Sequence, residues 1–134
     1  MTQLSYDNTF EGLLTAVFEI YEYKYPEPKI SKKDDLQQNL FAEKIEITTD
    51  VSKSDRVIKK LNAQIGSDGV RCIIWAFLSE KPAVEDVIFD VINYAVQNPT
   101  INIMKDFSNE SVLQISQLTK NVGREKHRME AFIR

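Results

Sequence analysis

Apolar side chains recur three and four positions apart in several stretches of the chain, which is the spacing that places them on one face of an α-helix. The clearest stretch contains Phe10, Leu13, Leu14, Val17, Phe18 and Tyr21. Asn8, followed three residues later by Glu11, is typical of a helix N-terminus, and Pro26 and Pro28 mark the end of the pattern. We therefore predict a first helix between Asn8 and Pro26.

The same spacing predicts four further helices. The second helix opens at Ser52 and ends at Gly66, and the third opens at Ser67 or Asp68 and continues to Leu78. The fourth is formed by Val84 to Ala95 and stops at Asn98-Pro99. The fifth opens at Ser108 and continues to the C-terminus. Residues 70–78 leave almost no polar face. We expect that third helix to be buried on all sides and to form the centre of the core.

Two segments have the character of strands. Leu4 to Tyr6 could pair as an edge strand, and Phe41 to Thr49 alternates between apolar and polar residues. Between them, the segment from Lys29 to Gln38 is polar, and we interpret it as a loop. A sheet of two strands is marginal alone, so it should pack on the helices. The predicted fold is α+β and predominantly helical, with about five helices and a small sheet near the N-terminus. We expect residues 1–134 to form a single globular domain.

Composition narrows the class of protein. The chain has 134 residues, of which 43% are hydrophobic and 28% charged, as in ordinary globular proteins. The single cysteine, Cys72, can form no disulfide within the chain, which favours a reducing compartment and hence the cytoplasm. No apolar run is long enough to cross a bilayer, so we expect no membrane partner.

Positive charge is concentrated at the C-terminus of a chain whose net charge is −3. Residues 120–134 contain five Lys or Arg and only two Glu, and on a helix their cations would lie beside an apolar stripe that includes Ile115 and Leu118. Such a face is either a solvated basic surface or a contact surface for nucleic acid or a partner protein. The candidate contact residues are Lys120, Arg124, His127, Arg128 and Arg134.

No constellation of residues predicts a reaction. One His and one Cys do not make a zinc motif, and Cys72 lies in the most apolar stretch, where a thiol is usually inert. The four glycines are scattered and form no phosphate loop. Phe18, Tyr21, Tyr23 and Tyr25 could stack on bases, although packing is the commoner role of such a cluster. We expect no catalytic residue, cofactor or metal site.

Three blocks together resemble one family. They are Tyr6-Asp7-Asn8-Thr9-Phe10-Glu11-Gly12-Leu13-Leu14-Thr15 with Val17-Phe18-Glu19, Ala76-Phe77-Leu78-Ser79-Glu80, and Val122-Gly123-Arg124-Glu125-Lys126-His127-Arg128-Met129 with Phe132-Ile133-Arg134. The family is bacterial and labelled "probable DNA metabolism protein". It is a domain of unknown function associated with a radical-SAM DNA repair or modification protein, and it is fused in some members to a uracil-DNA-glycosylase-like domain. Members often carry Gly where this chain has Asn8, and they continue beyond Arg134, so the chain resembles their N-terminal part.

The resemblance implies a role in bacterial DNA repair or modification but no reaction. We expect a non-catalytic accessory domain that contacts DNA phosphate or a partner protein through the basic residues. Two alternatives stay open: the scaffold half of a DNA-acting hydrolase or glycosylase whose chemistry lies beyond Arg134, and an interaction module for the radical-SAM protein. Whether the chain is an enzyme, and its oligomeric state, also stay open.

Overall fold

The structure is a computed structural model that describes residues 1–32 and 43–120. It divides into two compact units, residues 1–60 and 61–134, and the boundary falls inside a helix. The prediction of one globular domain stays a prediction.

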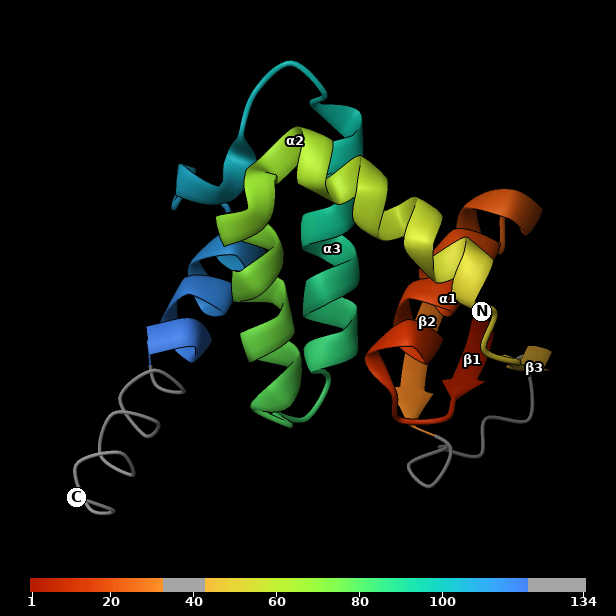
Figure 1. Cartoon of the computed structure of the whole chain (residues 1–134). Coiled ribbons are helices and arrows are strands. Elements are labelled where there is room, and N and C mark those ends of the chain that lie inside the picture. The colour runs from red at the N-terminus through yellow and green to blue at the C-terminus, as the bar shows by residue number, and fades with distance from the viewer. Residues whose placement is uncertain (33–42, 121–134) are drawn as a thin grey trace, which may run out of the picture. The chain divides into compact units, whose positions relative to one another are not determined.

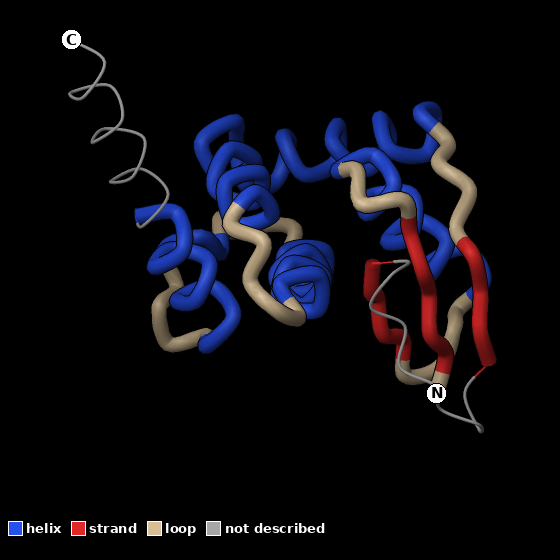
Figure 2. The backbone as a smooth tube through the Cα atoms, turned by 90° about the horizontal axis from the view of Figure 1, so that it is seen from below, coloured by secondary structure: helices blue, strands red, loops and turns tan. Residues whose placement is uncertain are grey.

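The first unit is built on a parallel sheet whose central strand is β1 (Thr2–Tyr6). β2 (Pro28–Lys32) and β3 (Glu43–Glu46) pair with its two edges, so the order is β2-β1-β3 (Figures 1 and 2). Leu4 lies opposite Ile30 in β2 and opposite Ile45 in β3. All five residues of β1 are buried. This is the expected state of a strand in a parallel sheet.

The sheet corrects three predictions. The first strand is central instead of an edge, and residues 29–32, expected in a loop, belong to β2. Ile30 is the single buried residue of β2, so the segment carries too short an alternation to be recognised. The expected strand from Phe41 to Thr49 shortens to β3, and Phe41 lies outside the described residues.

The first predicted helix is confirmed as α1 (Phe10–Tyr23), which connects β1 to β2. Parallel strands need such a crossover because the chain must return to the same end of the sheet. The N-cap is Thr9 instead of Asn8: its Oγ1 accepts a hydrogen bond from Gly12 N at 3.0 Å. Asn8 has a φ of 69°, a region that Asn and Gly adopt more readily than other residues.

The Asp7 carboxylate ties this turn to the chain that follows β3. Its Oδ1 accepts from Thr9 N (3.1 Å) and Thr9 Oγ1 (2.5 Å), and its Oδ2 accepts from Thr49 Oγ1 (2.7 Å). The hydrogen bond from the Thr9 side chain, followed by that from Thr49, lowers the pKa of Asp7 below its usual value of 3.8. A Cβ on Gly12 would lie 2.3 Å from Asp7 Oδ1, so this position has no room for a side chain.

The next two predicted helices are one element, α2 (Val51–Leu78). Gly66 interrupts it with a φ of 75° and a ψ of 172°, so the predicted break is present but the helix resumes after it. Asp50 Oδ1 accepts from Ser52 N at 3.0 Å, the hydrogen bond of a helix start. The described residues therefore contain four helices instead of about five: α1, α2, α3 (Val84–Gln97) and a helix that begins at residue 110 and reaches residue 120.

The second unit contains the rest of α2, then α3, the short 3₁₀ helix η2 (Ile103–Lys105) and the helix over residues 110–120 (Figure 1). Its apolar core takes residues from each of them: Leu61, Ile65, Ile73, Ala76, Val84, Ile88, Val91, Ile92, Ala95, Ile103, Val112 and Ile115. α3 ends before Asn98-Pro99, as predicted. No helix in the described part of the chain is both long and apolar enough to span a membrane.

The expectation that residues 70–78 are buried on all sides is wrong. Ile73 is fully buried, whereas Ile74 and Trp75 are half-buried and Leu78 is 60% exposed. The buried residues Val70, Ile73 and Ala76 are three apart and share one face. An apolar composition does not by itself supply neighbours for every face of a helix.

Adjacent isoleucines in α2 provide a matched test of this orientation. We expect Ile73→Ala to lower the free energy of unfolding by about 2–5 kcal/mol, because the change leaves a cavity in the core. Ile74→Ala should cost clearly less, since its side chain is partly exposed. Urea unfolding of both variants measures the difference, and equal losses would show that the helix is rotated from its assigned position.

The hydrogen bonds that Asp7 accepts from Thr9 and Thr49 should make the stability of the fold depend on pH. Because the folded pKa is lowered, the charged carboxylate stabilises the fold above the unfolded value near 3.8, and this contribution is lost as the pH falls through the folded value. Asp7→Asn should therefore be less stable than the parent chain at pH 6, and the gap should close towards pH 2. Urea midpoints measured across this range test it. A gap that does not change with pH would show that the carboxylate charge plays no part.

Candidate functional site

Of the five predicted contact residues, Lys120 lies within the described part of the chain. It is exposed near the end of the helix over residues 110–120, whereas Val112 and Ile115 of the same helix are fully buried. Leu118 is half-buried. The expected separation of an apolar stripe from a basic face is therefore present as far as this helix is described. Arg124, His127, Arg128 and Arg134 lie outside the described residues.

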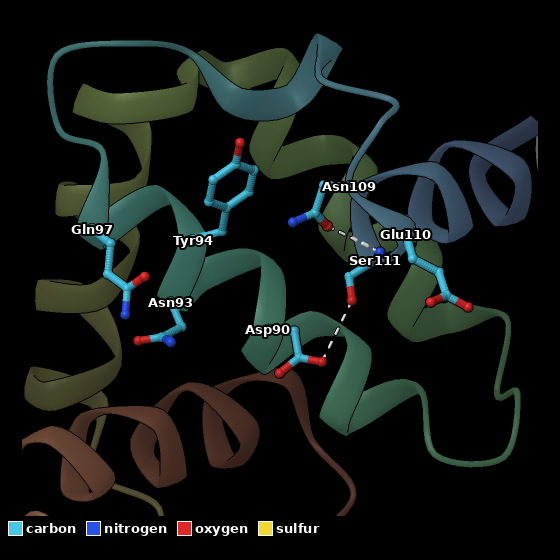
Figure 3. Close-up of a pocket in the computed structure, with 7 residues that line it drawn as sticks. All are labelled: Asp90, Asn93, Tyr94, Gln97, Asn109, Glu110 and Ser111. Atoms are coloured by element: carbon cyan, nitrogen blue, oxygen red, sulfur yellow. Dashed lines mark hydrogen bonds between the residues drawn. The ribbon is translucent and has the colours of Figure 1, made fainter.

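A polar hollow of about 330 Å³ lies in the second unit between α3 and the start of the helix over residues 110–120 (Figure 3). It is lined by Asp90, Asn93, Tyr94, Gln97, Asn109, Glu110 and Ser111. The four α3 residues follow helical spacing, so they share one face. The face of α3 that carries Ile88, Val91, Ile92 and Ala95 packs in the core instead.

Hydrogen bonds fix the wall of the hollow formed by the last helix. Asn109 Oδ1 accepts from Ser111 N (3.0 Å) and Val112 N (3.1 Å), which makes Asn109 the N-cap of this helix, where the sequence suggested Ser108. Ser111 Oγ donates to Asp90 Oδ2 at 3.4 Å, and Figure 3 shows these two side chains pointing toward one another. This contact joins α3 to the start of the last helix.

Tyr94 borders the hollow and is held by a neighbouring carboxylate. Its hydroxyl donates to Asp106 Oδ2, and Asp106 Oδ1 accepts from Ser108 Oγ. The bond to Asp106 raises the pKa of Tyr94, while the bond from Ser108, followed by that from Tyr94, lowers the pKa of Asp106. The Tyr94 hydroxyl therefore uses its proton in the hydrogen bond to Asp106.

Among the residues that the structure describes, the lining combines two carboxylates, three amides and two hydroxyls and includes no Lys or Arg. This composition suits a ligand that donates hydrogen bonds or carries positive charge. Sequence reasoning missed the hollow because its polar residues on α3 look like an ordinary solvated face. The signal that could have found it is Asn109, a capping residue that brings Glu110 and Ser111 to the same place.

The aromatic cluster at the end of α1 contacts Lys53 and has contacts among its own rings, while Tyr21 and Tyr23 remain 40% and 55% exposed. Lys53 Nζ lies 5.7 Å from the ring centre of Phe18 and 5.9 Å from that of Tyr23, and it also pairs with Glu19 at 3.2 Å and Glu22 at 3.3 Å. The rings of Tyr23 and Tyr25 are 5.6 Å apart. These contacts give the rings partners within the chain, and the packing role stays a prediction.

Cys72 is a free, half-buried thiol, and its backbone carbonyl accepts a hydrogen bond from Thr119 Oγ1 at 3.2 Å. His127, the single histidine, lies outside the described residues. Within residues 1–32 and 43–120, no group of three or more His, Cys, Asp or Glu residues is placed to hold a metal ion.

Comparison with known proteins finds similarity in the C-terminal part of the chain. The family model of a domain of unknown function, DUF4130, matches residues 82–134. No curated protein and no solved structure matches the chain. The matched segment begins just before α3 and includes all the lining of the hollow, Lys120 and the basic C-terminal residues. Both candidate surfaces therefore belong to the segment that is similar to this domain of unknown function.

Proposed function

We propose that the chain is a non-catalytic accessory domain in bacterial DNA repair or modification, acting in the cytoplasm. In this proposal Lys120, Arg124, His127, Arg128 and Arg134 contact DNA phosphate. The observation that carries the proposal is the concentration of five Lys or Arg and two Glu in residues 120–134 of a chain with net charge −3. The exposed position of Lys120 supports it, because the first of these cations is free to meet a ligand.

Phosphate contact is the simplest use of such a segment. Arg124 and Arg128 are four residues apart, and a guanidinium forms charge-assisted, often bidentate bonds to phosphate oxygens. Neutralising phosphates releases counterions, so affinity should fall as the salt concentration rises. The rest of the chain is acidic on balance. Binding should therefore depend strongly on this short segment.

A role as an interaction module for a radical-SAM protein is the second candidate. The hollow favours it, because its two carboxylates, with no lining cation among the described residues, attract a basic partner and repel DNA. The scaffold role for a hydrolase or glycosylase, with the chemistry beyond Arg134, rests on the family resemblance alone.

DNA titrations of the full chain at several salt concentrations test the proposal. We expect Arg124→Ala with Arg128→Ala to weaken binding of single-stranded or duplex DNA, and to reduce the slope of log affinity against log salt by up to about 2, one per lost phosphate contact. Fluorescence anisotropy with a labelled oligonucleotide measures both quantities.

The matched control is Arg56→Ala with Lys59→Ala, which removes two exposed cations from α2 and leaves the same net charge. This control should bind DNA with a nearly unchanged slope. If both double variants lose affinity equally, binding follows net charge and the C-terminal segment has no special role. If the Arg124 and Arg128 variant unfolds in circular dichroism, the pair is structural and the scaffold role replaces the proposal.

A further inference from the structure

Helix α2 bends at a single residue. Its two helical segments, residues 51–65 and 67–78, are separated by Gly66 alone, whose φ of 75° and ψ of 172° are non-helical. No loop residue lies between the segments, so the bend is made by the two backbone torsions of this glycine. A residue with a side chain hardly ever adopts this combination of angles. The bent form therefore depends on glycine at position 66.

A second glycine is needed for the same bend. A Cβ added to Gly69 would lie 2.8 Å from Cβ and Cγ1 of Ile65, a core side chain with an exposed fraction of 2%. In a straight helix the Cβ atoms of residues four positions apart are about 5–6 Å from one another. The clash at position 69 is therefore a property of the bent form, and a straight α2 would not have it.

Nothing around Gly66 blocks another backbone conformation at this residue. A Cβ built on Gly66 would meet no atom within 4 Å, so its backbone torsions, and not crowding, explain the glycine. Glycine is among the least favourable residues in a helix interior, yet it does not prevent helical torsions as proline does. Residues 61–78 contain no proline. The stretch is thus compatible with a bent and with a straight helix.

Asn102 supplies a hydrogen bond to the bent form. Its Nδ2 donates to the backbone oxygen of Ile65 at 3.4 Å, and its Oδ1 accepts from Met104 N at 3.0 Å, which orients the amide at the start of η2. The last carbonyls of a helical segment have no partner within that segment, so a side-chain donor is useful there. A bond of 3.4 Å is long and weak, so it can be broken at small cost.

We propose that Gly66 is a hinge at which α2 exchanges between the bent form and a minor straight form, in which the helix is continuous. Straightening turns Gly66 to helical torsions, removes the constraint at Gly69 and breaks the bond from Asn102. The bent form is the major one, because Leu61 and Ile65 are packed in the core, each with an exposed fraction of 2%.

The hinge lies in the helix through which the chain passes from the first unit to the second. A change of torsion at Gly66 therefore redirects that connection. This conformational role is independent of the proposed DNA contact, and its test needs no DNA.

Relaxation-dispersion NMR of the labelled full chain tests the hinge. We expect exchange at the amides of residues 64–69 and at the side-chain amide of Asn102, with one common rate, because one event moves both. Asn102→Ala should raise the population of the minor form about 2- to 10-fold, the effect of one lost hydrogen bond. The matched control is Asn62→Ala, which removes an exposed amide from the same helix and should leave the exchange unchanged. No exchange in either the parent chain or Asn102→Ala would overturn the hinge.

Two further variants should make the straight form the major one. Gly69→Ala adds the Cβ that clashes in the bent form, and Gly66→Ala disfavours the bent torsions without adding a clash. In each, the ¹³Cα shift of residue 66 should become helical and the side-chain amide of Asn102 should shift, whereas Asn62→Ala should change neither. A folded variant that keeps a non-helical shift at residue 66 would contradict the hinge. Unfolding of both variants would also contradict it, since the bent form would then be the single fold open to this helix.

Discussion

The pairing of β1 with a parallel strand on each edge is the constraint on which the first unit depends. A strand paired on both sides and buried along its whole length can have no free backbone groups, and β2 and β3 supply the partners. Parallel pairing requires the chain to return to the same end of the sheet between strands, and α1 makes the first of these returns. The turn from β1 into α1 must then be tight. Asp7, Thr9 and Gly12 meet this need by filling the turn with hydrogen bonds and leaving no space for a Cβ.

In the second unit, α3 and the helix over residues 110–120 each turn an apolar face to the core and a polar face away from it. α3 turns Ile88, Val91, Ile92 and Ala95 to the core and leaves Asp90, Asn93 and Gln97 to line the hollow. The helix over residues 110–120 likewise buries Val112 and Ile115 and exposes Lys120. The hollow is thus lined by carboxylates, whereas the sequence of residues 120–134 is rich in Lys and Arg. In our proposal the basic segment contacts DNA phosphate.

The sequence predicted the elements whose periodicity is long and undisturbed. α1 and α3 were expected from the recurrence of Leu13, Val17, Ile88 and Val91, and from the prolines that follow them. β2 was missed because one buried residue, Ile30, gives no alternation, and its strand conformation is set by pairing with β1. The apolar run from Val70 to Leu78 predicted a helix correctly but not which face is buried, since that depends on which helices lie beside it.

The candidate sites likewise differ in whether local sequence or the packing of distant residues defines them. Local charge in the sequence was the basis for predicting Lys120, Arg124, His127, Arg128 and Arg134 as contact residues, which stays a prediction. The hollow could not be found in this way, because Asp90 and Ser111 are far apart in the chain and meet only through the packing of two helices. Asn109 illustrates the limit: Ser108 and Asn109 are both good capping residues, and only the hydrogen bonds from Ser111 and Val112 distinguish them.

The central functional claim is that DNA meets the basic segment and avoids the acidic hollow. Mapping the backbone amide shifts of the ¹⁵N-labelled chain on addition of a short DNA duplex at low salt tests this most directly. The account predicts that the largest shifts fall within residues 120–134, that they disappear at high salt, and that Asp90, Glu110 and Ser111 are unaffected. Shifts centred on the hollow or on the aromatic cluster around Lys53, or no shifts at all, would contradict it.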